Sequence, residues 1–427
     1  MRLILIEPSA AKRADFEPLS LSRPIWQLRC GMTSLGEKLI AKLRPAETAC
    51  FVEPYMAAFL AESLTMKVND PATLAGADLL LVNGRVKVTG FDVAPTGAGE
   101  IGVGDDGEVM YARLSKAEAD KCKADTLEAF LAVAKKIVPV KTVNLPVWNY
   151  TWDLVLQCGE EITREFKARG RSGVEGTLEQ PSAIRGDPKN VYIAPGAKIH
   201  PMVVIDAEHG PVYLDEKVTV HPFTRIEGPC FIGAGSILLG AKCREGNSIG
   251  PMCRIGGEVE ESIVHGHSNK YHDGFLGHAY VGEWVNLGAL TTNSDLKNDY
   301  SSVSVIMDGK RTVDTGSTKV GSLIGDHTKT SVGVLLNTGS YVGAMALIMA
   351  TGQPLQKFLP SFAWLIDGHV TKGFGRKQLY ATAAIAKSRR GAKWTPAEEA
   401  MWEAIFQLTA EPRDAAIQKG RKAMLRK

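Results

Sequence analysis

The sequence lacks the features that mark several common classes of protein. Its 427 residues contain no apolar run of membrane-spanning length, and the apolar start at residues 3–6 is too short for a signal peptide. The seven cysteines form no CxxC pair, so neither a zinc ribbon nor a disulfide framework is predicted. A net charge of +3 is too small to predict binding to nucleic acid or to a membrane. We therefore expect a cytoplasmic protein with reduced thiols.

A six-residue repeat is the strongest positive feature of the chain. Near the end it reads Ile324, Thr330, Leu336, Val342 and Ile348, and the same step joins Ile226, Ile232 and Leu238 and joins Ile249 and Ile255. A period of six fits neither an amphipathic helix nor an alternating strand. It is typical of a hexapeptide β-helix, in which each short strand is one face of a coil.

The patterns divide the chain into three parts. Residues 1–168 alternate between strand and helix patterns, with capping boxes beginning at Ser34 and Ser115, and predict a Rossmann-like α/β domain. A Gly-rich linker at residues 169–177 leads to the hexads of residues 178–355. The repeat is interrupted at residues 298–318, where Asp308-Gly309 predicts a protruding hairpin. Residues 356–427 are predicted to be a helical extension, in which Thr395 and Pro396 begin one helix.

Histidines gather in the predicted coil. Five of the nine lie between His221 and His278. No three-ligand spacing with a carboxylate emerges, so we predict no metal site. A histidine that acts as a general base near neutral pH is the better interpretation, although polar residues at loop corners would explain any single one of them.

The segment from Asn269 to Asn293 resembles the acetyltransferase domain of the GlmU family, bifunctional N-acetylglucosamine-1-phosphate uridylyltransferase/glucosamine-1-phosphate acetyltransferase. When the two are registered on Leu276-Gly277, the catalytic histidine of the family falls on His272 and its substrate-region asparagine on Asn293. The motif Ile249-Gly-Pro-Met-Cys-Arg254 matches the family's Ile-Gly-Pro-x-x-Arg. The resemblance implies a left-handed β-helix, a homotrimer and acetyl-CoA as co-substrate.

The same resemblance implies a role for each site residue. His272 would take a proton from the amino group of a sugar 1-phosphate as it attacks acetyl-CoA, and Asn293 would complete the catalytic pair. The substrate-binding candidates are Arg254, Lys270, Asn286 and Lys297.

Two departures from the family pattern concern the substrate. Phe275 stands where the family has a tyrosine, and Glu260-Glu261 stand where it has paired lysines. This reversal of charge weighs against glucosamine 1-phosphate itself as the substrate.

The N-terminal part is similar to a divergent group of sugar nucleotidyltransferases. The Gly-rich loop that wraps a triphosphate is missing after residue 6, and Asn83-Gly84-Arg85 replaces the family's Asn-Gly-Asp, whose aspartate holds Mg²⁺. The candidate nucleotide-binding residues are Arg13, Arg23, Arg29, Lys38, Asn83 and Arg85. Salt bridging explains Arg23 and Arg29 equally well.

Three hypotheses follow from the sequence. The first is an acetyl-CoA-dependent sugar-phosphate N-acetyltransferase, with or without a coupled nucleotidyl transfer by the N-terminal domain. The second is a sugar-1-phosphate nucleotidyltransferase that uses UTP or dTTP with Mg²⁺, and whose coil serves only for trimerisation. The third is a non-catalytic scaffold that binds a nucleotide sugar.

Overall fold

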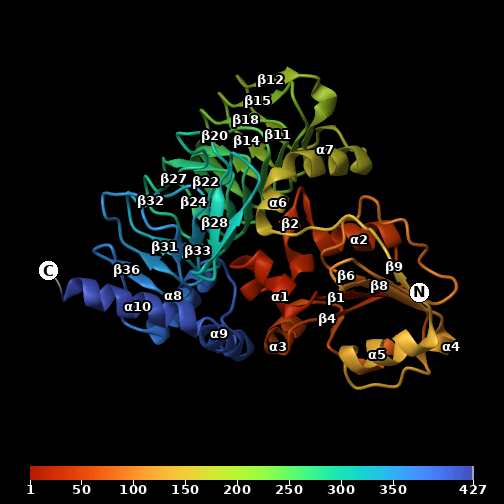
Figure 1. The fold of residues 1–427 in the computed structure, drawn as a ribbon. Helices are drawn as coiled ribbons and strands as arrows, with labels where there is room; N and C mark the ends of the chain where they lie inside the picture. The colour runs from red at the N-terminus through yellow and green to blue at the C-terminus, as the bar shows by residue number, and fades with distance from the viewer. Residues whose placement is uncertain (426–427) are drawn as a thin grey trace.

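The computed structural model describes residues 1–425, in which an α/β domain, a long β-coil and a group of helices follow one another along the chain. Figure 1 shows the N-terminal domain (red to orange) beside the coil (green to cyan) and the last helices (blue) near the C-terminal end of the coil. The predicted order of an α/β domain, a left-handed parallel β-helix and C-terminal helices is confirmed.

The N-terminal domain is built on one seven-stranded sheet. Residues 79–83 form its most deeply buried strand, all five of them buried. The first four are apolar, as a strand covered on both faces requires. In spatial order the strands are β5 (Lys67–Val68), β4 (Glu47–Phe51), β1 (Arg2–Ile6), β6 (Leu79–Asn83), β8 (Val109–Leu114), β7 (Glu100–Val103) and β9 (Val140–Thr142).

Helices cover both faces of this sheet and continue toward the coil. They are α1 (Ala10–Arg13), α2 (Leu35–Leu43), α3 (Pro54–Ser63), α4 (Lys116–Ala119), α5 (Leu127–Ile137), α6 (Thr151–Leu156) and α7 (Cys158–Arg169). The two predicted capping boxes are confirmed: Ser34 exchanges hydrogen bonds with Glu37, and Ser115 with Glu118.

The coil has three faces. The first is a ten-stranded parallel sheet of β10 (Gly173–Val174), β13 (Val191–Ile193), β16 (Val212–Leu214), β19 (Cys230–Ile232), β21 (Asn247–Ile249), β23 (Ile263–Gly266), β26 (Tyr280–Glu283), β30 (Leu323–Ile324), β33 (Tyr341–Val342) and β35 (Phe358–Leu359). The second face contains β11 (Thr177–Leu178), β14 (Lys198–Ile199), β17 (Thr219–Val220), the first halves of β20 (Ile237–Cys243) and β22 (Arg254–Glu260), β24 (Asn269–Lys270), β31 (Lys329–Thr330), β34 (Leu347–Ile348) and β36 (Trp364–Ile366). The third contains β12 (Ala183–Gly186), β15 (Val204–Ala207), β18 (Arg225–Glu227), the second halves of β20 and β22, β25 (Phe275–Gly277), β27 (Thr292–Asn293) and β32 (Leu335–Leu336).

The hexads arise because an apolar residue near the end of each short strand points into the coil. Ile232 does so from the first face, Leu238 from the second and Cys243 from the third, and all three are fully buried. Rungs about 4.8 Å apart place these side chains in continuous apolar rows, which no single coil could bury alone.

The coil begins earlier and ends later than the repeat suggested. Strand β10, inside the predicted linker, already pairs with β13. At the other end β35 and β36 continue the coil past residue 355, because Leu359 and Leu365 resume the six-residue step after a longer loop. Strand β37 (His369–Thr371) then turns back antiparallel to β36, and the helices α8 (Arg376–Ser388), α9 (Pro396–Leu408) and α10 (Ala410–Met424) follow.

The interruption of the repeat is the predicted hairpin. Strands β28 (Ser304–Met307) and β29 (Arg311–Asp314) pair antiparallel around Asp308-Gly309. Val303, Val305 and Met307 at its base are buried against the first face of the coil.

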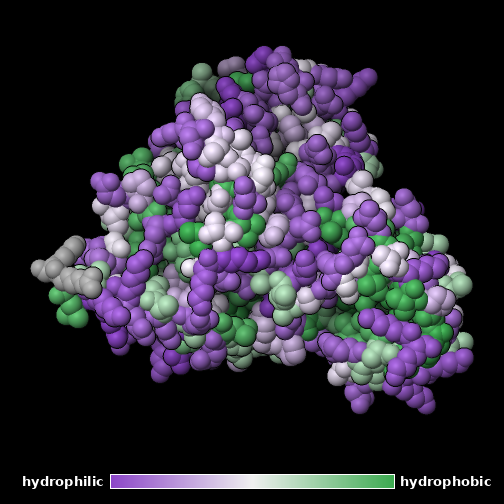
Figure 2. Space-filling view, in the orientation of Figure 1, coloured by the Kyte–Doolittle hydropathy of each residue, from purple (hydrophilic) through white to green (hydrophobic). Residues whose placement is uncertain are grey.

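The first face of the coil and the N-terminal domain share a hydrophobic core. Tyr213, Phe231 and Tyr280 from the coil pack in one cluster with Phe16 and Trp152 of the N-terminal part, which also contains the short hairpin β2 (Arg29–Cys30) and β3 (Thr33–Ser34). The surface seen in Figure 2 is mostly hydrophilic, and apolar residues gather chiefly over the N-terminal domain. Among residues 1–425, no helix combines the length and the apolarity that crossing a membrane requires.

Candidate functional site

A groove of about 860 Å³ lies between the second face of the coil and helix α8. Its floor and one side come from the coil, including Tyr271, His272 and Trp284. Its other side comes from α8 and the residues just after it: Thr382, Ile385, Ala386, Arg389 and Arg390. The groove therefore joins two parts of the chain that are about a hundred residues apart in sequence.

Four polar side chains form a ladder along the groove floor. Arg254, Asn269, Asn286 and Lys329 stand in register on successive coils, at positions that point outward from the second face. The residue after each of them points inward, which is the alternation that a strand imposes. Two cations thus flank two amides at intervals of about 4.8 Å.

Hydrogen bonds hold the ladder in place. The Asn269 Nδ2 donates to Asn286 Oδ1 at 3.2 Å, and Arg390 donates to Asn269 Oδ1 at 2.7 Å. Lys329 Nζ donates to the carbonyl of Trp284 and, at 3.1 Å, to that of His327. Burial lowers the pKa of Lys329 to about 8, although nearby Asp326 opposes the shift.

The charge of the groove has one sign. Arg254, Lys329, Arg389 and Arg390 line it, and none of its lining residues within the described part of the chain is acidic. Such a groove attracts an anion, and guanidinium groups bind phosphate oxygens in pairs.

His272 stands at the rim of this groove, on the corner between the second and third faces of the coil. Its side chain is exposed, and the ring of Tyr271 meets it edge-on at 6.0 Å between centroids. Asn286 and Arg254, two of the predicted substrate-binding residues, line the same groove. The structure therefore brings these three predicted residues together.

The structure places the other three predicted residues of the coil elsewhere. Asn293 points into the coil, where its Oδ1 accepts from the Gly277 N–H at 2.8 Å and its Nδ2 donates to the Gly277 carbonyl at 2.9 Å. Lys270 is also directed inward, and Lys297 donates to Ser301 Oγ in the loop before the hairpin. These three do not line the groove, and their predicted roles toward substrate remain predictions.

Arg23, one of the predicted nucleotide-binding residues, joins the N-terminal domain to the coil. Its guanidinium forms an ion pair with Asp326, which also accepts a hydrogen bond from Ser22 at 2.8 Å. Glu283 lies 3.7 Å from the same guanidinium, and although burial opposes it, this cation holds the pKa of Glu283 well below its usual range. Salt bridging, the second interpretation of Arg23, therefore describes its contacts.

Arg85 and Asn83 hold the end of the central strand. Arg85 is 1% exposed, and its guanidinium contacts Asp106 at 3.0 Å and Asn149 at 3.1 Å. The Asn83 Oδ1 accepts from the Arg85 N–H, and its Nδ2 donates to the Val109 carbonyl. A guanidinium thus stands where the family's Mg²⁺-binding carboxylate would be, and this position does not fit a divalent cation.

The remaining three N-terminal candidates also have internal partners. Arg13 donates to the Tyr55 hydroxyl at 3.0 Å, and Lys38 contacts Glu165 at 2.6 Å. Arg29 donates to a backbone carbonyl of its own turn and lies 5.7 Å from the centre of the Phe231 ring.

A pocket of about 270 Å³ opens at the carboxyl ends of β1 and β4, where open α/β sheets usually bind ligands. Its charged lining residues are Glu7, Glu53, Asp125 and Glu128. Burial raises the pKa of Glu7 to about 8, although Arg13 opposes the shift. Glu7 is therefore mostly neutral at pH 7. The pocket has no basic lining residue among those described, and its acidic lining does not suit the triphosphate of a nucleotide.

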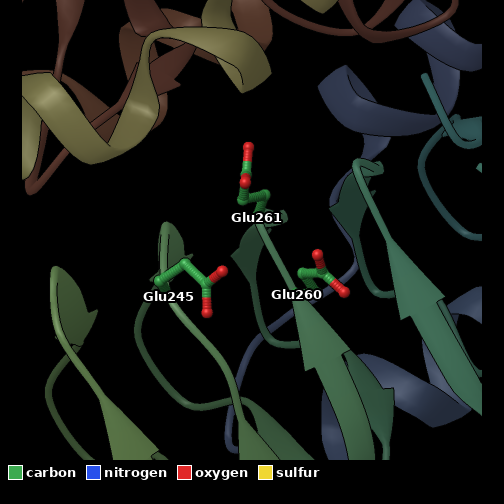
Figure 3. Close-up of side chains that lie close together, drawn as sticks. All are labelled: Glu245, Glu260 and Glu261. Carbon is green, nitrogen blue, oxygen red and sulfur yellow. The ribbon is translucent and has the colours of Figure 1, made fainter. Parts of the chain in front are cut away.

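Three carboxylates meet at another corner of the coil. Figure 3 shows Glu245, Glu260 and Glu261 close together. One carboxylate oxygen of each lies within 4.8 Å of those of the other two. Cations already hold two of them: Glu260 contacts Arg244 and Lys319, and Glu261 contacts His278. Glu260 and Glu261, the reversed charges noted in the sequence, do not line the groove beside His272.

Several groove residues escaped the sequence analysis. Lys329, Arg389 and Arg390 supply three of its four cations. His267, one of the five histidines counted in the sequence, stacks on Trp284 at 4.4 Å between ring centres. The pair Arg389-Arg390 before Gly391 was visible as a basic helix end, but nothing in the sequence showed that α8 would lie against the coil.

Comparisons with known proteins cover parts of this chain. Residues 3–172 match the family model described as sugar nucleotidyl transferase. A bifunctional sugar-1-phosphate nucleotidylyltransferase/acetyltransferase of Sulfurisphaera tokodaii is 36% identical over 91 residues, which are 21% of this chain and 22% of that protein. The bifunctional protein GlmU of Polaromonas naphthalenivorans is 37% identical over 150 residues, 35% of this chain and 28% of that protein. The resemblance to the GlmU family is therefore confirmed, over less than a third of the length of either relative.

Among solved structures, the UDP-N-acetylglucosamine acyltransferase of Francisella novicida aligns with a TM-score of 0.25 and 14% identity, over 56% of this chain and 78% of that one.

Proposed function

We propose that this GlmU-like chain transfers an acetyl group from acetyl-CoA to the amino group of a sugar 1-phosphate, in the groove beside His272. The observation that carries the proposal is the groove itself. A histidine that matches the family's catalytic base stands at the rim of a cavity with four cations and no acidic lining residue among those described. Both substrates are anionic, so the charge of the groove suits them.

The proposed reaction uses His272 as a general base. The amino nitrogen attacks the thioester carbonyl carbon, and the imidazole takes the proton that the nitrogen loses. When the tetrahedral intermediate collapses, the C–S bond breaks and the coenzyme A thiolate leaves. The imidazolium returns the proton to this thiolate, so the histidine ends the cycle neutral.

The ladder on the groove floor is the proposed site of the anionic groups. Arg254 and Lys329 would bind phosphate oxygens, while Asn286 would donate or accept hydrogen bonds with sugar hydroxyls. Lys329 is already held by two carbonyls and is therefore fixed in position before substrate binds. A preformed cation loses less entropy on binding than a mobile one.

Nucleotidyl transfer by the N-terminal domain is the second candidate function, and the match of residues 3–172 to the sugar nucleotidyl transferase model favours it. Its proposed substrates are a sugar 1-phosphate and UTP or dTTP. The internal partners of the six candidate residues and the acidic pocket at the strand ends weigh against it. The acyl transfer is therefore the first proposal.

Two assays on the purified protein separate these functions. An amino-sugar 1-phosphate and acetyl-CoA should release a thiol, detected with a disulfide chromogen, and His272→Ala should reduce kcat about 100- to 10,000-fold. His209→Gln, a change at an exposed histidine away from the groove, should leave the rate unchanged. Pyrophosphate release from UTP or dTTP with Mg²⁺ that survives His272→Ala would instead support nucleotidyl transfer. Silence in both assays across a panel of sugar phosphates contradicts both proposals.

A homotrimer is the proposed assembly, as the family resemblance implies. The corner of the coil that carries His272 also exposes apolar side chains on other coils: Met202 is 54% exposed, Phe223 74%, Leu290 58% and Val332 62%. Exposed apolar rows of this kind mark protein interfaces. Light scattering should give three times the 46.1 kDa chain mass, and Phe223→Asp should lower it.

A further inference from the structure

Lys270 occupies a position that the neighbouring coils give to apolar side chains. In the inward row of the second face it follows Leu238 and Ile255, with which the register aligns it. Leu287 comes next along the coil, where its N–H donates to the carbonyl of Asn269. Lys270 is nevertheless only 4% exposed. Burying an ammonium group among aliphatic neighbours is costly, so its presence requires a reason.

The ammonium group of Lys270 binds the corner that carries His272. Its Nζ donates to the His272 carbonyl at 2.7 Å and to the Gly256 carbonyl at 2.8 Å. It thereby ties the corner at residues 271–274 to the preceding coil from the inside. Gly257 leaves room for this contact: a Cβ there would lie 2.6 Å from Nζ, and the φ of +66° is one that glycine adopts without strain.

The other backbone restraints on this corner follow His272: the Asp273 carbonyl accepts the N–H of Leu290 at 2.8 Å, and the Gly274 carbonyl accepts the N–H of Glu258 at 3.2 Å. Residues 271–274 lie between β24 and β25 and belong to neither strand, and the side chain of His272 is exposed. The amide of Phe275, just after the corner, donates to Thr292 Oγ1 at 2.8 Å. The inward hydrogen bond from Lys270 is therefore the contact that fixes the His272 carbonyl.

We propose that Lys270 is a positioning residue, which holds the His272 corner from inside the coil so that the imidazole is presented to the groove. The effect on catalysis rests on the proposed function of His272, whereas the effect of Lys270 on the corner at residues 271–274 is independent of that function. Lys270 does not line the groove, so the proposed role differs from the substrate contact predicted from the sequence.

The charge that Lys270 carries is sensitive to pH. Burial lowers its pKa to about 8, and Asp273 on the same corner, Cys243 on β20 and Glu258 on β22 oppose the shift. A neutral amine is a weaker donor than an ammonium, because hydrogen bonds from ionised groups are about twice as strong. The corner is thus expected to loosen as the pH rises through about 8.

The test compares Lys270→Met with Ile255→Met, a methionine placed in the same inward row one coil earlier. Hydrogen exchange, followed by mass spectrometry on the full chain, should be at least about 10-fold faster in residues 271–276 of Lys270→Met and unchanged there in Ile255→Met. In wild type the same segment should exchange faster above pH 8 after correction for the intrinsic pH dependence. Equal exchange in both variants and in wild type overturns the proposal.

Acetyl transfer provides the second measurement. In Lys270→Met we expect kcat to fall about 100-fold, with a smaller change in KM, because a misplaced base slows the chemical step more than binding. In wild type, kcat should fall as the pH rises through about 8, and this fall should be absent in Lys270→Met. If wild type shows no acetyl transfer but the exchange result holds, only the proposed function fails. An unchanged kcat in an active Lys270→Met enzyme overturns the positioning role.

Discussion

At the scale of single residues, buried charges in this protein are matched by specific partners. His278 shows this most fully, because it is 2% exposed and lies between Asp295 at 2.8 Å from Nδ1 and Glu261 at 3.1 Å from Nε2. Burial alone would lower the pKa of His278, but the hydrogen bonds to Asp295 and Glu261 outweigh burial and raise the pKa to about 9. In the sequence, His278 is only one of five histidines close together along the chain, and no pattern there indicates that two acids enclose it.

The first prediction is that His278 stabilises the fold only while it is protonated. Because its folded pKa is raised, the stabilisation is fully present below pH 6.5, declines between 6.5 and about 9, and is lost above that. Urea unfolding of wild type and His278→Gln should give a stability difference that shrinks by at most about 3 kcal/mol over this range.

Comparing the two proteins at each pH cancels groups that titrate in both, including Lys270 and Lys329. A stability difference that stays constant from pH 6 to 10 contradicts the prediction.

At the scale of elements, the C-terminal helices provide what the coil cannot. Helix α8 forms the wall of the groove and α9 packs on α3 of the N-terminal domain, so the two helices link both larger parts of the molecule. A buried ion pair between Lys387 on α8 and Glu398 on α9 joins them. Lys387 also lies 5.7 Å from the ring centre of Trp284, at the end of the groove.

The second prediction concerns this pair. Lys387→Met leaves Glu398 buried without its cation, and we expect the free energy of unfolding to fall by roughly 3–5 kcal/mol. The double variant Lys387→Met/Glu398→Leu removes both charges and should recover most of that loss.

Urea unfolding of the single and double variants gives the coupling energy of the pair. Additive effects of the two substitutions would show that the helices are held by apolar packing alone.

At the scale of the whole molecule, the N-terminal domain is docked rather than tethered. The aromatic residues on the first face of the coil and those of the N-terminal part form one core, and Arg23 reaches Asp326 across the boundary. Asp326 Oδ1 also accepts the N–H of Glu283 at 2.8 Å. One carboxylate therefore accepts bonds from both parts.

The third prediction is that the two parts unfold together in calorimetry and that Asp326 contributes strongly to this. Asp326→Ala removes the nearest carboxylate partner of the buried Arg23 guanidinium and leaves only Glu283 at 3.7 Å. This should cost roughly 3–5 kcal/mol and shift or split the single transition.

The matched control is Asp206→Ala, which breaks an ion pair with Arg185 whose side chain is 56% exposed. It should cost less than about 1 kcal/mol, because water screens an exposed pair. Equal losses from the two substitutions would falsify the docking role of Asp326.

The sequence alone determined the regular parts of this protein. A six-residue step requires three short faces per coil, so Ile232 and Leu238 predicted the β-helix, and Asp308-Gly309 predicted the hairpin. Capping at Ser34 and Ser115 is local chemistry and was predicted correctly for the same reason. The sequence also pointed to the region around His272, because the segment that resembles a known family is local and spans only a few coils.

Only the tertiary structure decided which charges face the groove and which face the interior. Lys270 and Asn293 stand one residue from outward positions, and a strand alternates its two sides, so a shift of one position reverses their surroundings. Arg23 and Arg85 find their partners more than 20 residues away, and Arg389 reaches the groove because α8 folds back on the coil. Such contacts depend on how elements pack in space, and no local pattern in the sequence encodes that packing.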